Sequence, residues 1–205
     1  MNGKKIISLA LFLVACGTAC LVMDKSAAKP VAHIPNPPSV EQVQQWAKPP
    51  TNVQLTLLTN EPDVYQLQET MGKDGKVIWA REYRCIKGRS QDSYVIAIFE
   101  PGTLFGTNRA GLVDFSKQMA NNTNGYLEPM KTYVRPRTLS SGRQSYGGMN
   151  GFDPIRFSFQ TQFDLLVINS FESGENYPPE EKIEVPNFEN FFRLFDEVDG
   201  FLNSQ

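Results

Sequence analysis

The chain has 205 residues, a formal net charge of −2 at pH 7 and 40% hydrophobic residues. This length supports one domain with a substantial core and is short for two domains. A charge so close to zero provides no overall basic field, so we expect no nucleic-acid partner.

The first sixteen residues have the profile of a bacterial export signal. Lys4 and Lys5 precede an apolar run over residues 6–15, in which Ser8 is the only polar residue. At about 1.5 Å of rise per residue this run spans about 15 Å, which is half of a bilayer core. The run therefore cannot cross a membrane alone, and it is typical of a secretory signal.

The residues that close this run, Leu13-Val14-Ala15-Cys16, resemble the lipobox of bacterial lipoprotein precursors. The resemblance implies a signal peptide over residues 1–15, cleavage before Cys16 and lipidation of Cys16. It also implies that the protein is located in the cell envelope and is attached to the membrane through this lipid anchor. Because Gly17 and not Asp follows the cysteine, it further implies the outer membrane, facing the periplasm, in an organism with two membranes.

Two other ways of processing the N-terminus stay open. The apolar stretch can be extended to Met23, which makes residues 6–23 just long enough for an uncleaved transmembrane anchor. An ordinary signal peptidase could instead cut after Gly17-Thr18-Ala19 and leave Cys20 as the first residue, without lipid.

Residues 16–51 are expected to form the lipidated N-terminus and a tether. Six prolines between positions 30 and 50 favour an extended conformation in this segment. Within it, Ser39-Val40-Glu41-Gln42 has the form of a capping box and predicts a short helix that could dock on the core.

Residues 52–205 are expected to form a single α+β domain with an antiparallel sheet and packed helices. Alternation of apolar and polar residues, or continuous apolar runs, predict strands at 53–57, 65–67, 77–86, 94–99, 131–139, 155–160 and 163–171. Helical spacing of apolar residues predicts one helix near residues 112–119 and a closing helix over 188–202, whose aromatic stripe should pack on the sheet.

This order of elements is similar to the PsbP-like α+β sandwich, which is also seen in small envelope lipoproteins of the DcrB type. The similarity rests on the strand meander, the helix, the further antiparallel strands and the strand at 165–171 before the closing helix. The resemblance implies a binding or accessory protein without catalytic residues, and it assigns no site positions. Fold-level analogy is by itself a weak guide to function.

The residues that most enzymes and metal sites need are scarce in this sequence. The only histidine, His33, lies in the tether, so no catalytic residue is proposed for a serine or cysteine hydrolase. Cys20 and Cys85 are too few for a zinc site, and Cys85 is expected to be a buried hydrophobic residue. Because nucleotide-binding motifs are also missing, we expect neither a metal nor a cofactor.

One local charge pattern suggests a ligand site. Residues 131–156 contain five basic residues and a single acid. If this segment is a strand, Tyr133, Arg135 and Arg137 project to one face, and with Arg143 they could bind a carboxylate, a phosphate or a glycan. Alternatively, these arginines pair with the acidic segment 172–199 and form a solvated face.

The sequence therefore predicts a lipid-anchored envelope protein that binds another envelope component, most simply a protein. Two alternatives remain open. One is an envelope enzyme that uses paired carboxylates on a glycan or peptidoglycan substrate. The other is a structural spacer with no ligand of its own, and no feature identifies a small-molecule ligand.

Overall fold

The domain is described by a computed structural model, which covers residues 33–49, 53–60, 75–121, 128–150, 153–172, 177–181 and 188–205. The chain divides into two compact units, Met1–Val31 and Ala32–Gln205. The signal peptide, the lipobox and the strand expected at 65–67 lie outside the described residues. The segment after residue 32, which was expected to belong to the tether, is part of the second unit.

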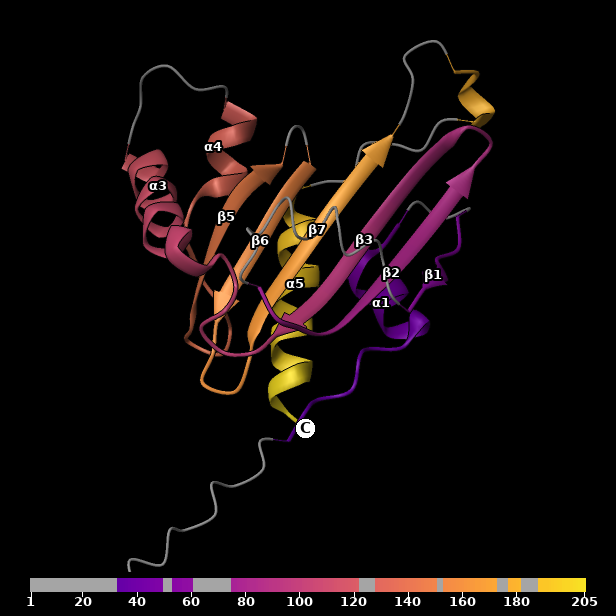
Figure 1. Cartoon of the computed structure of the whole chain (residues 1–205). Coiled ribbons are helices and arrows are strands. Elements are labelled where there is room, and N and C mark those ends of the chain that lie inside the picture. Colours follow the sequence, from indigo (N-terminus) through magenta and orange to yellow (C-terminus); the bar gives the residue numbers. More distant parts are fainter. Residues whose placement is uncertain are drawn as a thin grey trace, which may run out of the picture. The chain divides into compact units, whose positions relative to one another are not determined.

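In the described residues, a seven-stranded sheet in the order β1-β2-β3-β7-β6-β5-β4 forms the centre of the fold (Figure 1). The strands are β1 (Thr56–Thr59), β2 (Val77–Lys87), β3 (Ser90–Phe99), β4 (Arg137–Thr138), β5 (Gln144–Asn150), β6 (Asp153–Phe159) and β7 (Asp164–Glu172). Every neighbouring pair is antiparallel. The α+β class with an antiparallel sheet is therefore confirmed.

Four α-helices and two short 3-10 helices accompany the sheet in the described part of the chain. They are α1 (Val40–Ala47), η1 (Gly106–Asn108), α3 (Arg109–Asn121), α4 (Glu128–Val134), η2 (Pro179–Glu181) and α5 (Phe188–Asn203). Figure 1 shows α5 and α1 on one side of the sheet, whereas α3 and α4 lie near β5 at one end of it.

Apolar side chains cover both faces of the central strands. On the α5 side, Ile96 and Val167 of the sheet pack with Phe195 and Val198 of the helix. On the other side, Ala97, Phe99 and Leu166 pack with Leu104, Phe105 and the first turns of α3. The parts of β3 and β7 that are buried on both faces, residues 94–99 and 165–168, are apolar throughout, as the run at 94–99 predicted for an inner strand.

The short helix α1 forms as the capping box predicts. The Ser39 hydroxyl accepts a hydrogen bond from the Gln42 amide, and the Gln42 side chain accepts one from the Ser39 amide. Val43 and Ala47 are buried in the core, and the rings of Trp46 and Phe201 lie 5.6 Å apart. The helix is therefore docked on α5.

The segment that leads into α1 is fastened to the sheet and to the C-terminus. The Trp79 indole donates to the Pro35 carbonyl at 2.8 Å, and the Tyr83 hydroxyl donates to the Pro38 carbonyl at 2.6 Å. Asn36 and Gln205 exchange backbone and side-chain hydrogen bonds at 2.8 and 3.1 Å. The beginning of the described domain and its end therefore lie side by side (Figure 1).

The strand expected at residues 131–139 is wrong. Residues up to Val134 belong to α4, and β4 contains only Arg137 and Thr138. The buried Arg156 guanidinium donates to the Tyr133 and Arg135 carbonyls at 3.1 and 2.9 Å, so it satisfies backbone groups at the end of the helix. This distant contact stabilises a helix where the local pattern favoured a strand.

The glycine-rich run that follows is also regular structure, because β5 includes Gly147 and Gly148. A Cβ atom on Gly147 would lie 2.0 Å from the Tyr133 carbonyl oxygen. Glycine is therefore required here so that the end of α4 can approach the strand.

Cys85 is buried as expected, and burial raises the pKa of its thiol to about 12.

Candidate functional site

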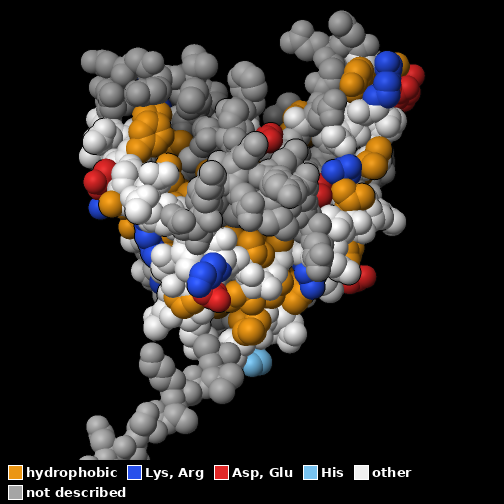
Figure 2. Space-filling view, viewed as in Figure 1, with side chains coloured by type: hydrophobic (Ala, Val, Ile, Leu, Met, Phe, Trp, Pro, Cys, Tyr) orange, Lys and Arg blue, Asp and Glu red, His pale blue; other side chains and the backbone are white. Residues whose placement is uncertain are grey.

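A cavity of about 680 Å³ lies where β6 turns into β7, next to the C-terminal end of α5. Its lining includes Arg109 at the start of α3, Arg143 before β5, Phe159 at the end of β6, Gln160 in the β6–β7 turn, and Leu202 and Asn203 in α5. His33 and Gln205 also line it, and the pale blue histidine marks this end of the domain in Figure 2. This volume is within the range of small-molecule sites, about 300–1,000 Å³.

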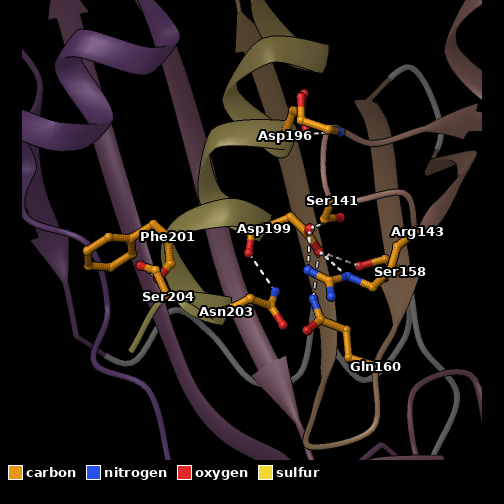
Figure 3. Close-up of polar contacts among 10 residues, drawn as sticks. Ser141, Arg143, Ser158, Gln160, Asp196, Asp199, Phe201, Asn203 and Ser204 are labelled. Carbon is orange, nitrogen blue, oxygen red and sulfur yellow. Dashed lines mark hydrogen bonds and ion pairs between the residues drawn. The ribbon is translucent and has the colours of Figure 1, made fainter.

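Asp199 of α5 is the centre of a polar network beside the cavity (Figure 3). Its carboxylate is fully buried and accepts hydrogen bonds from Arg143 Nη2 at 2.8 Å, Gln160 Nε2 at 2.7 Å, Ser141 Oγ at 2.9 Å and Ser158 Oγ at 3.5 Å. These donors come from the segment before β5, from β6 and from the β6–β7 turn. The network therefore holds Arg143 and Gln160 in fixed positions at the cavity.

Arg109 is held from two sides. Its Nη2 donates to the buried Asp164 carboxylate at 3.2 Å, and its guanidinium carbon lies 3.4 Å from the centre of the Phe159 ring. Asp164 also accepts from the Gly102 and Leu104 amides at 2.9 and 3.2 Å. Burial raises the pKa of the Asp164 carboxyl, while Arg109 and these amides act in the opposite direction.

The two arginines have the same electrostatic arrangement. Each guanidinium pairs with a carboxylate whose side chain is 0% exposed, while 30% of the Arg109 side chain and 32% of the Arg143 side chain remain exposed. The formal charges of the two pairs cancel. The cavity therefore presents oriented N–H donors without an uncompensated positive charge.

One acceptor beside the cavity has no hydrogen-bond partner. The Gln160 Oε1 atom is buried and unpaired among the described residues, whereas Nε2 of the same amide is bound to Asp199. Buried polar atoms of folded proteins nearly always have a partner. This oxygen has almost no accessible surface, so its side chain would have to shift slightly before an N–H or O–H group of a bound molecule could satisfy it.

Of the four residues predicted to form a ligand site, Arg143 is the one that lines this cavity. Tyr133 is in α4, and its ring centre lies 6.4 and 6.5 Å from those of two phenylalanines of α5. Arg135 follows α4 and is exposed. Arg137 pairs with Glu189 at 3.0 Å. The structure does not place Tyr133, Arg135 and Arg137 on the one strand face that was predicted.

Two arginines pair with acids of the segment 172–199, Arg137 with Glu189 and Arg143 with Asp199. The alternative interpretation of the basic residues expected pairs of this kind. A smaller cavity of about 230 Å³ lies beside Arg137, Arg156 and Phe192. Arg156 is only 1% exposed, and burial lowers the pKa of its guanidinium to about 9. Its hydrogen bonds go to the Tyr133 and Arg135 carbonyls at the end of α4 and to the Ser145 hydroxyl of β5, which indicates a structural role.

Sequence reasoning missed Arg109, Gln160, Asp164 and Asp199. Arg109 and Gln160 lie far from Arg143 along the chain, and no local pattern brings them to it. Asp199, in contrast, had a local signal in the sequence. It follows Phe195 by four positions and therefore lies on the apolar face of α5. A single carboxylate on a buried helix face indicates a specific polar partner.

The described residues contain no group of three or more His, Cys, Asp or Glu that could hold a metal ion. In the same part of the chain, no helix has the length and the apolar character needed to cross a bilayer. Comparisons with protein-family models, curated proteins and solved structures find no match for this chain.

Proposed function

We propose that the protein is a lipid-anchored binding or accessory module of the cell envelope, which recognises another envelope component through the cavity beside Asp199. The observation that carries this proposal is the pair of arginines, Arg109 and Arg143. Each is fixed by a wholly buried carboxylate and is still partly exposed. Burying a carboxylate costs desolvation energy. Here each buried carboxylate holds an arginine guanidinium in a fixed orientation, as recognition sites require.

The proposed anchor at Cys16 sets a limit on where the cavity can act. From Cys16 to His33 the chain has 17 peptide steps, which span about 60 Å when fully extended at about 3.3–3.6 Å per residue. An anchored domain would therefore keep the cavity within about 60 Å of the membrane surface. Components of the same membrane and of the adjacent envelope are within this distance.

We also propose that the fold belongs to the PsbP-like group. The order of the described elements supports this, because three antiparallel strands, two helices, further antiparallel strands and a closing helix follow one another. A fold of this kind suits a binding protein, but the fold does not identify the ligand.

Photocrosslinking in living cells tests the binding function. A photoreactive amino acid replaces Gln162, which is exposed in the β6–β7 turn at the cavity, and a control probe replaces Glu197, which is exposed on α5. We expect a discrete adduct from the first position only, and we expect it to disappear when Arg109 and Arg143 are both changed to Gln. A correctly localised protein that gives no adduct from Gln162 would refute the binding function.

The anchor has its own test. The intact mass of the mature protein should include a diacylglyceryl group and an acyl chain, and both should be missing from Cys16→Ser. A mass equal to that of the unmodified chain would remove the lipid from the proposal and leave the cavity as it is.

The enzymatic alternative requires two carboxyl groups that face a bound glycan. The residues described around the cavity offer no such pair. The spacer alternative expects no adduct at any position, so the crosslinking experiment distinguishes it from a binding module.

A further inference from the structure

We infer that the cavity beside Asp199 binds a molecule that ends in a free carboxylate with an N–H or O–H donor next to it, such as the C-terminus of a peptide. This inference rests on the proposed function, since it names the ligand class of the same cavity. Three features of the cavity lead to it: the unused donors, the balanced charge and the unpaired acceptor.

The unused donors belong to the two guanidinium groups. Arg143 uses Nε and Nη2 for Asp199, at 3.4 and 2.8 Å, and Arg109 uses Nη2 for Asp164 at 3.2 Å. A guanidinium has five N–H donors, so each arginine has donors that no described residue accepts. Planar groups with several fixed N–H donors match the two oxygens of a carboxylate.

The balanced charge favours a ligand with a single negative charge. Asp164 and Asp199 already neutralise the two arginines, so a dianion such as phosphate would introduce two uncompensated negative charges near buried carboxylates. One carboxylate introduces only one such charge and makes charge-assisted hydrogen bonds with the remaining donors. The observations therefore favour a carboxylate over a phosphate.

The unpaired acceptor adds a requirement that a simple anion does not meet. Gln160 Nε2 is fixed on Asp199, so Oε1 of the same amide is the atom left for a ligand. A carboxylate would repel this oxygen, but the amide N–H of the residue that carries the terminal carboxylate would donate to it. The last residue of a peptide has both groups at this spacing.

An uncharged glycan fits less well. Sugar rings commonly stack on an exposed aromatic face, and Phe159 contributes the phenyl ring among the described residues that line the cavity. Arg109 covers one face of this ring at 3.4 Å, and the ring centres of Phe157 and Tyr146 lie 5.5 and 6.2 Å away. The ring therefore serves to position Arg109 and offers an apolar wall, together with Leu202, for a small side chain.

Titration of the full chain with defined probes tests this inference. The probes are N-acetyl-alanyl-alanine with a free carboxylate, the same dipeptide as its C-terminal amide, inorganic phosphate and an uncharged disaccharide. We expect the free acid to bind and to shift the side-chain 15N signals of Arg109 and Arg143. We expect the amide to bind at least about tenfold more weakly, because it lacks the charge-assisted hydrogen bonds.

Variants connect the binding to these residues. Arg143→Lys keeps the charge beside Asp199 and removes the planar fork, and Gln160→Met removes the acceptor at nearly constant size. Each should weaken binding of the free acid about tenfold. The thermal unfolding midpoint of Arg143→Lys should stay close to that of the parent, whereas Gln160→Met should lower it, because this change also removes the Nε2 donor from the buried Asp199 carboxylate. Arg89→Gln is the matched control, because Arg89 pairs with Glu181 outside the cavity, and it should leave binding unchanged.

The outcomes separate this inference from the proposed function. Equal binding of acid and amide, or preferred binding of phosphate or the disaccharide, overturns the ligand class and leaves a binding cavity. Absence of binding by every probe also overturns the ligand class. The proposed function then stands if the Gln162 probe still gives an adduct, and it fails as well if no adduct forms.

Discussion

Replacing Asp92 by Asn should remove a pH-dependent loss of stability. Asp92 lies on β3 and is 0% exposed. Tyr94 Oη donates to its Oδ2 at 2.6 Å, and Asn169 Nδ2 donates to its Oδ1 at 2.6 Å. Burial raises the pKa of the Asp92 carboxyl from 3.8 to about 6, although these two hydrogen bonds oppose the change.

The direction and size of the effect follow from this pKa. A carboxyl whose pKa is higher in the folded state keeps its proton better there, so its contribution to stability is complete below about pH 4 and is lost as the pH rises through about 6. The rise from 3.8 to about 6 is about 2 pKa units, and each unit corresponds to about 1.4 kcal/mol. The parent protein should therefore lose about 3 kcal/mol relative to Asp92→Asn between pH 4 and pH 7.

Urea unfolding of both proteins at pH 4, 5, 6 and 7 measures this difference. Asn can occupy the site, because its amide can accept from one neighbour and donate to the Tyr94 hydroxyl. Asp114→Asn on the exposed side of α3 controls for the change in net charge. A stability difference between parent and Asp92→Asn that stays constant, or that grows in favour of the parent with rising pH, would refute the reasoning.

Other substitutions test the packing around the site. Asp199→Ala removes the acceptor of four side chains and leaves Arg143 without its carboxylate partner. Urea unfolding should therefore show a free energy of unfolding that is lower by about 3 kcal/mol. An unchanged free energy of unfolding would contradict the central role of Asp199. Gly147→Ala should destabilise by about 1–3 kcal/mol, because the new methyl group meets the backbone of α4. A Cβ atom on Gly200 would have no neighbour within 4 Å, so Gly200→Ala should instead stabilise α5 by up to about 1 kcal/mol. Equal effects of the two glycine substitutions on stability would show that the close approach of α4 to Gly147 is not the cause. Ser39→Ala should lower the unfolding free energy by about 1 kcal/mol through loss of the α1 cap, and no change in the urea midpoint would show that the cap is unimportant.

The sequence alone determined the elements whose signals are local. The capping box at Ser39 predicts the start of α1, and the spacing of Phe191, Phe195 and Leu202 predicts the buried face of α5. The continuous apolar run at 94–99 predicts β3 as an inner strand. The runs at 155–160 and 163–171 predict β6 and β7 as a strand pair joined at residues 161–162. These features depend on the periods of helix and strand and on cap chemistry, which act over a few residues.

Only the tertiary structure decided the conformation of residues 128–138 and the composition of the cavity. The segment around Tyr133 alternates like a strand, yet the Arg156 guanidinium and the glycine at 147 favour a helix ending against β5. Asp199 accepts hydrogen bonds from donors that lie 39 to 58 residues earlier in the chain. Such contacts compensate for the desolvation of buried charges only when the whole fold brings the partners together. No local sequence pattern indicates which residues, so far apart along the chain, will meet.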